Sequence, residues 1–180
     1  MKWVPFFSQT GSEILKLIER TNIKPYLIVT NNKNAQLKNN DYIVKEAIPV
    51  LTASHEDIVK YFSVQPKHKK IITLHGYLRI LPESMCKRFK IFNGHPGAIH
   101  VYSDLKGKDP QEKVWNNLKK YNIIGSVVHK CTSKLDSGKI LYTETITNNV
   151  STKQELYEEL KTTSLNAWIR FLRDEFKDRY

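Results

Sequence analysis

A carboxamide and an imidazole stand two residues apart in the segment Asn93-Gly94-His95-Pro96-Gly97. Side chains at positions i and i+2 of a strand leave the same face, so Asn93 and His95 can point into one cleft. Gly94 between them leaves room for a substrate to approach the backbone. An amide can donate a hydrogen bond to an oxyanion, and an imidazole can act as acid and base. Asn, Gly and Pro also form ordinary turns, so this segment alone fits a solvated turn equally well.

A carboxylate, Asp136, lies in a second tight segment, Leu135-Asp136-Ser137-Gly138, between two apolar runs. Such a segment is typical of hairpin turns, and taken alone it favours a turn residue over a catalyst. Together with Asn93 and His95 it completes a set that suits acyl transfer, because a carboxylate can orient the imidazole and raise its pKa. His129 lies seven positions earlier, and we interpret it as a structural histidine on a strand face.

These side chains need a scaffold that brings strand ends together, and the apolar runs predict one. Strands are expected at residues 3–7, 25–30, 42–44, 49–51, 70–74, 91–93, 125–130 and 139–146. Helices are expected at residues 13–20, from the N-cap Ser54, at 83–89, at 110–121, and from the N-cap Ser151 into a long C-terminal helix that frays over 173–180. The alternation predicts an α/β fold with a mostly parallel, Rossmann-like twisted sheet and helices on both faces. Ligands of such sheets bind beyond the carboxyl ends of the strands.

The composition is that of a globular protein, and residues 1–180 are expected to form a single catalytic domain. The net charge of +11 attracts anions, and we favour solvated surface plus small-anion attraction over a dedicated nucleic-acid face. No apolar run approaches the roughly 20 residues of a membrane span, so no membrane partner is expected. The two cysteines, Cys86 and Cys131, have neither disulfide nor metal spacing, which favours a reducing cytoplasm and no metal.

The order of these motifs resembles the folate-dependent formyltransferase family, and most closely its glycinamide ribonucleotide branch. The family pattern Asn-x-His-Pro matches residues 93–96, and its Leu/Ile-Asp-small-Gly turn before an apolar strand matches residues 135–141. The stretch Leu74-His75-Gly76-Tyr77-Leu78-Arg79-Ile80-Leu81 looks like the family segment that lines the pterin pocket. Gly107-Lys108-Asp109-Pro110 is similar to the Gly-x-x-Pro that starts the next helix. The resemblance runs from about residue 3 to about residue 172.

This resemblance implies a donor, 10-formyltetrahydrofolate, and an acceptor that is a primary amine of a small phosphorylated substrate. Asn93 and a protonated His95 would hydrogen-bond the tetrahedral oxyanion, and Asp136 would keep His95 charged and help to pass on the proton of the amine. The residues implied to bind the folate are Leu78, Arg79, Ile80, Leu81, Lys134 and Leu135. The residues implied to bind the acceptor are Gly11, Ser12, Glu13 and Gly76, where Gly11-Ser12 falls at the phosphate site of the glycinamide ribonucleotide enzymes.

Departures from the family pattern concern the acceptor side. Glu13 stands where the glycinamide ribonucleotide enzymes have Asn, and a carboxylate at a helix N-terminus would compete with a phosphate there. The usual Ser-Leu-Leu-Pro after His-Pro is replaced by residues 97–100, Gly-Ala-Ile-His. Three alternatives therefore stay open: a nucleotide-sugar amine as acceptor, a modified nucleotide or nucleic acid as acceptor, and a non-catalytic basic nucleic-acid-binding module.

Overall fold

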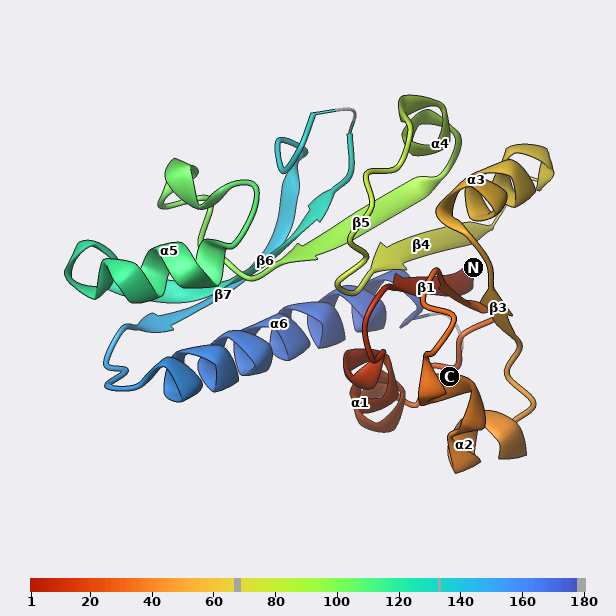
Figure 1. Cartoon of the computed structure of the whole chain (residues 1–180), viewed down its shortest axis with the longest axis horizontal. Coiled ribbons are helices and arrows are strands. Elements are labelled where there is room, and N and C mark those ends of the chain that lie inside the picture. Colours follow the sequence, from red (N-terminus) through yellow and green to blue (C-terminus); the bar gives the residue numbers. More distant parts are fainter. Residues whose placement is uncertain (67–68, 133, 178–180) are drawn as a thin grey trace. The chain divides into compact units, whose positions relative to one another are not determined.

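The computed structural model describes residues 1–66, 69–132 and 134–177, and these form two compact units (Figure 1). The first unit spans residues 1–93 and the second residues 94–177. The chain passes from one to the other within a strand, β5, which ends two residues beyond the boundary. Among the described residues, no helix is long and apolar enough to cross a membrane.

The first unit is built on parallel strands in the order β3-β2-β1-β4-β5. Their bounds are Lys2–Phe7 for β1, Ile28–Thr30 for β2, Val50–Thr52 for β3, Lys70–Leu74 for β4 and Lys90–His95 for β5. Strands β1 and β4 are apolar runs whose side chains are buried almost throughout, as expected for parallel strands covered on both faces. Because all five strands run the same way, their carboxyl ends meet at one edge.

Helices of the first unit lie on both sides of these strands, with α1 and α2 on one side and α3 and α4 on the other (Figure 1). Their bounds are Ser12–Thr21 for α1, Asp41–Lys45 for α2, His55–Val64 for α3 and Glu83–Arg88 for α4, with a short 3-10 helix at Gln36–Asn39. The expected N-cap of α3 is confirmed, since the Ser54 hydroxyl accepts the Asp57 N–H at 3.1 Å. The mostly parallel α/β fold is therefore confirmed.

The second unit pairs two antiparallel strands, β6 (Ile123–Lys130) and β7 (Ile140–Thr147), and packs the long helix α6 (Lys153–Glu175) against both. Helix α5 (Pro110–Asn116) and two short 3-10 helices, Ser103–Leu105 and Leu118–Lys120, complete it. Trp168 and Phe171 on α6 are fully buried. Gly125 is required in β6 because a side chain there would collide with the backbone of Glu144 on the partner strand.

Some predicted elements were wrong in type or extent. Residues 42–44 belong to helix α2 instead of a strand, because the Asn40 side chain accepts the first free N–H groups of that helix. The helix predicted at 110–121 stops at Asn116, where Asn117 adopts a non-helical backbone (φ −143°, ψ 47°) and a 3-10 turn follows. The strand predicted at 25–30 is formed only over Ile28–Thr30.

The N-cap of α6 is Thr152 and not Ser151. The Thr152 hydroxyl accepts the Glu155 N–H at 3.1 Å, while the Glu155 carboxylate accepts the N–H groups of Ser151 and Thr152. This reciprocal arrangement is a capping box, in which each side chain satisfies a backbone donor that the helix itself leaves free. The predicted fraying over 173–180 falls partly outside the described residues, and α6 continues through Arg173 to Glu175.

Replacing Thr152 with Ala should lower the free energy of unfolding by about 1 kcal/mol, because the Glu155 N–H then loses its acceptor. Urea denaturation followed by circular dichroism measures the change. The control is Ser151→Ala, which keeps the backbone N–H that Ser151 contributes and should have little effect. A larger loss for Ser151→Ala than for Thr152→Ala would contradict the capping assignment.

Candidate active site

His95 lies at the carboxyl end of β5 and belongs to a cluster of buried polar side chains in the second unit. Strand β5 runs two residues further than predicted, so His95 is a strand residue and not part of the turn. Only 4% of His95 is exposed. Its Nε2 lies 2.8 Å from the carbonyl oxygen of Leu105, and its Nδ1 lies 3.3 Å from Asp136 Oδ2. The fold thus brings together two predicted residues that are 41 positions apart in the sequence.

Asp136 is held in the loop between β6 and β7 by local geometry that few sequences allow. Its backbone is left-handed, with φ at +46°, a conformation that Asp tolerates better than most residues. Gly138 follows at a position where any side chain would collide with the Lys130 carbonyl, so the loop closes only with glycine. The Gly107 N–H donates to Asp136 Oδ2 at 2.9 Å. The segment Gly107-Lys108-Asp109-Pro110, which leads into helix α5, therefore also supplies a hydrogen-bond donor to the buried carboxylate.

His129 also contacts Asp136. Its Nε2 lies 3.3 Å from Asp136 Oδ1, so the two oxygens of one carboxylate face two imidazoles. The register between β6 and β7 shifts between Val128 and His129, and such irregularities often redirect a side chain toward a site. The sequence indicates a structural histidine at position 129, because one histidine in an apolar strand carries no further signal. Its position next to the Asp loop is visible only in the fold.

Burial dominates the electrostatics of the His95–Asp136 pair. It lowers the pKa of His95 below the ordinary 6.5 and outweighs the Asp136 carboxylate and the Leu105 carbonyl, both of which raise it. Burial by itself would raise the pKa of Asp136, but contacts with His129, His95 and the Gly107 N–H bring it below the ordinary 3.8. Asp136 is therefore a carboxylate at neutral pH. The carboxylate raises the pKa of His95, as expected, but burial lowers that pKa by more.

Asn93 is the last residue of the first unit and lies on β5, two positions before His95. It is half-buried and pairs in register with Leu74 of β4. Gly94 between them was expected to admit a substrate to the backbone. That expectation was wrong: a side chain at Gly94 would meet Trp168 Nε1 at 2.5 Å, so the indole of α6 takes the space. Glycine is required here for packing.

The residues implied to bind the acceptor lie at the carboxyl ends of β1 and β4 in the first unit. Gly11 caps α1 with φ at +73°, and Ser12 and Glu13 form the first turn of that helix. Glu13 Oε2 lies 2.7 Å from Nδ1 of His75, whose side chain is only 1% exposed. For Gly76, with φ at +65°, the one atom found within 4.0 Å of where a side chain would start is Gln9 Oε1, among described residues other than its two chain neighbours. The structure thus leaves open space at Gly76.

The residues implied to bind the folate differ in exposure. Leu78 and Ile80 are 69% and 74% exposed in the loop after β4, and Leu135 is 58% exposed beside Asp136. Arg79 and Lys134 are exposed as well. Leu81 is the exception, since it is buried in the core of the first unit. Exposed leucine and isoleucine side chains in loops are available to an aromatic ligand, whereas the Leu81 side chain packs in the core beneath the loop.

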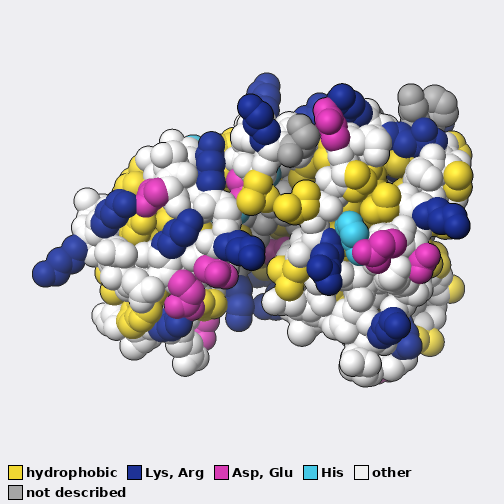
Figure 2. Space-filling model, turned by 45° about the horizontal axis from the view of Figure 1, so that its top comes forward, with side chains coloured by type: hydrophobic (Ala, Val, Ile, Leu, Met, Phe, Trp, Pro, Cys, Tyr) yellow, Lys and Arg dark blue, Asp and Glu magenta, His cyan; other side chains and the backbone are white. Residues whose placement is uncertain are grey.

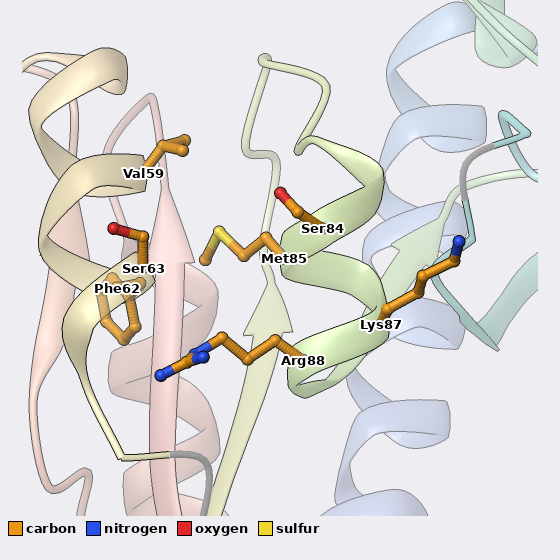
Figure 3. Close-up of a pocket in the computed structure, with 7 residues that line it drawn as sticks. All are labelled: Val59, Phe62, Ser63, Ser84, Met85, Lys87 and Arg88. Atoms are coloured by element: carbon orange, nitrogen blue, oxygen red, sulfur yellow. The ribbon is translucent and has the colours of Figure 1, made fainter.

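A cavity of about 300 Å³ lies between α3 and α4, and none of the residues predicted for the site lines it (Figure 3). Its walls combine Phe62 and Met85 with two serines and the cations of Lys87 and Arg88. Lys87 is paired with Glu83 at 2.7 Å, and Arg88 donates to the Gln65 carbonyl at 2.6 Å. These residues offer no acid–base pair for acyl transfer.

Positive charge is spread over the face of the molecule that Figure 2 draws. On the face drawn in Figure 2, dark blue Lys and Arg side chains are spread among uncharged ones and do not gather in one stripe. Among the described residues, no group of three or more His, Cys, Asp or Glu side chains is placed to hold a metal ion.

Comparisons with known proteins agree with the motif order. The model of the formyl transferase family matches residues 1–172. No curated protein matches the sequence. Among solved structures, phosphoribosylglycinamide formyltransferase of Campylobacter jejuni superposes with a TM-score of 0.81 at 18% identity, covering 98% of this chain and 97% of that one. The Bacillus halodurans enzyme of the same name gives a TM-score of 0.81 at 16% identity, covering 100% of this chain and 97% of that one.

A protein with a different printed activity is also similar. Formyltetrahydrofolate deformylase of Pseudomonas syringae superposes with a TM-score of 0.79 at 17% identity, covering 99% of this chain and 62% of that one. At such identities the structural similarity establishes the fold, and the family match confirms the resemblance drawn from the motifs.

Replacing Asp136 with Asn should lower the pKa of His95 further, because the carboxylate that partly offsets burial is removed. Histidine ring resonances followed by NMR during a pH titration measure this. The control is Glu144→Gln, which removes a carboxylate that is paired with Arg170. A His95 pKa that rises or stays unchanged in Asp136→Asn would show that the two side chains are not coupled as described.

Proposed function

Because the chain belongs to the formyl transferase family, we propose that it transfers the formyl group of 10-formyltetrahydrofolate to a primary amine of a small molecule. The observation that carries the proposal is the buried His95–Asp136 contact, with a carboxamide, Asn93, two residues earlier on the same strand. We propose these three residues as the catalytic set, residues 1–180 as one catalytic domain, and the cytoplasm as its location.

The reaction is an acyl transfer with a tetrahedral intermediate. The amine nitrogen attacks the formyl carbon, a C–N bond forms, and the carbonyl electron pair moves to oxygen. The amide of Asn93 and an N–H of His95 donate to that oxyanion, each contributing about 3–4 kcal/mol when well placed. The proton of the amine passes to N10 of the folate, the C–N10 bond breaks, and a formamide and tetrahydrofolate leave.

His95 must exchange one partner to take part in this reaction. Its Nε2 lies against the Leu105 carbonyl, and its Nδ1 faces Asp136. We propose that Nε2 leaves the Leu105 carbonyl to meet the formyl oxygen, while Asp136 continues to hold the ring. A ring that donates from both nitrogens is an imidazolium; burial opposes it by lowering the pKa of His95, and the Asp136 carboxylate supports it. His129 contacts the second oxygen of that carboxylate.

Following the family resemblance, we propose folate-binding residues in two loops that carry exposed apolar side chains, the loop after β4 in the first unit and the loop after β6 in the second. Leu78 and Ile80 provide apolar surface and backbone groups in the first, and Lys134 and Leu135 do so in the second. Arg79 is suited to a folate carboxylate. Leu81 is buried, and we propose that it contributes to the folate site by shaping the first loop from the core.

For the acceptor, glycinamide ribonucleotide is the reference candidate, because the names of the similar structures give that activity. A nucleotide-sugar amine or a modified nucleotide is the second candidate, because Glu13 in the first turn of α1 departs from the acceptor side of the family pattern. A non-catalytic nucleic-acid-binding role receives less support from the dispersed charge (Figure 2).

Purified protein mixed with 10-formyltetrahydrofolate and a panel of primary amines tests the proposal. The expected result is a folate product that appears, by absorbance, only when a suitable amine is present. Release of formate at the same rate without any amine would instead indicate hydrolysis. Absence of both turnover and calorimetric folate binding would reject the proposal.

Replacing Asn93 with Ala or His95 with Ala should each lower kcat by about 10²–10³, because each removes one donor to the oxyanion. Asp136→Asn should lower kcat through the orientation of His95. Steady-state kinetics with circular dichroism on each variant separate chemistry from folding. The control is His100→Asn, an exposed histidine in the segment that follows His95. Loss of stability without loss of specific activity would indicate that these residues serve the turns alone.

A further inference from the structure

The cavity between α3 and α4 is lined only by residues of the first unit, and none of them belongs to the proposed catalytic set. Its volume of about 300 Å³ lies at the lower end of the range of small-molecule sites, which is roughly 300–1,000 Å³. Both helices contribute apolar side chains, hydroxyl groups or cations to its lining (Figure 3). A lining of this kind is typical of a site for a small molecule with one apolar and one polar end.

The apolar part of the cavity is supported by the core of the first unit. Val59 of α3 and Met85 of α4 both point into the space between the two helices (Figure 3). Phe62 is fully buried, and its ring centroid lies 5.2 Å from that of Phe6 and 5.8 Å from that of Phe89. These aromatic contacts hold the base of the cavity in place. The unbranched side chain of Met85 can adapt its shape to an apolar ligand.

Arg88 carries a positive charge that no carboxylate of the described residues neutralises. Its side chain is half-buried and extends from α4 toward α3 (Figure 3). Of the five N–H donors of its guanidinium, the described residues accept one, which Nη2 donates to the Gln65 carbonyl at 2.6 Å. Nε is buried without an acceptor among the described residues. A buried donor without an acceptor is costly, so an added acceptor at this head group would stabilise it.

The other polar groups of the cavity are already engaged within their own helices. Lys87 pairs with Glu83 at 2.7 Å and leaves α4 on the side away from α3 (Figure 3). The Ser63 hydroxyl donates to the Lys60 carbonyl at 2.7 Å, so its oxygen can still accept a hydrogen bond. One uncompensated positive charge therefore stands beside an apolar cavity. This balance favours a ligand with a single negative charge and an apolar body over a dianion such as phosphate.

We propose that the cavity between α3 and α4 binds a small organic carboxylate, with the carboxylate on Arg88 and the apolar body against Val59 and Met85. A carboxylate is planar and accepts two parallel hydrogen bonds from a guanidinium, which makes this pairing both strong and specific. The N–H groups of Arg88 that the described residues do not use supply these donors. The inference does not rest on formyl transfer, because no residue proposed for that reaction lines the cavity.

Phenylacetate titrated into the protein tests the proposal, with calorimetry and the methyl resonances of Val59 and Met85 in NMR as readouts. We expect saturable binding that shifts both resonances. The neutral amide, phenylacetamide, and inorganic phosphate should each bind at least about tenfold more weakly, because one lacks the charge and the other the apolar body. Equal binding of either compound would overturn the proposal. Absence of saturable phenylacetate binding, or binding that leaves both resonances unshifted, would overturn it as well.

Two variants locate the ligand in the cavity. Arg88→Gln should weaken phenylacetate binding about tenfold or more, because the charge that meets the carboxylate is lost. The matched control is Lys87→Gln, which removes the neighbouring cation that is paired with Glu83 and should leave binding unchanged. An equal loss in both variants would indicate attraction by net charge alone and would reject the site.

Val59→Phe keeps Arg88 and fills the cavity from the α3 side, so it should abolish phenylacetate binding. It also provides the test if Arg88→Gln does not fold, and circular dichroism confirms the fold of each variant. Full binding by Val59→Phe would place the ligand elsewhere and reject the proposal. None of these measurements uses a folate or an amine, so their outcome is independent of whether the protein transfers a formyl group.

Discussion

The carboxylate of Asp136 is the group on which the second unit's polar core depends. It accepts the Gly107 N–H and faces one nitrogen each of His95 and His129, so it joins the end of β5, the segment before α5 and the end of β6. A carboxylate with only 4% of its side chain exposed is costly unless such partners surround it. The buried charge therefore requires these partners, and both histidines lie next to the same carboxylate.

The same constraint explains the glycines and the unusual backbone around it. Gly138 lets the β6–β7 loop pass against Lys130, and the positive φ of Asp136 turns its side chain inward. Gly94 keeps β5 in contact with Trp168 of α6, which fixes the strand that carries His95. Residues that looked like solvated turn formers thus hold one buried carboxylate and one buried imidazole in contact. The same backbone geometry therefore serves both the turns and the proposed catalytic role.

The sequence permitted much of this to be predicted, and the misses have physical reasons. An apolar run such as residues 70–74 is typical of a parallel strand that is buried on both faces. The segment 42–44 was misassigned because its short apolar pattern fits either element, and the deciding Asn40 cap lies outside it. His129 and the partnership of Glu13 with His75 could not be predicted, since each depends on a residue that is distant in the sequence or on a strand irregularity. Propensity and periodicity describe neighbours along the chain, whereas these contacts arise from strand order.

Each unit contains a carboxylate beside a buried histidine, and the surroundings give the two pairs different chemistry. In the first unit, the His75 ring lies between Thr73 Oγ1 at 2.8 Å and Glu13 Oε2 at 2.7 Å. In the second, a carbonyl and a carboxylate face the two nitrogens of His95, so a protonated ring has an acceptor for each N–H while burial opposes its charge. A ring balanced in this way can take up and release a proton, which suits the role proposed for His95 in acyl transfer.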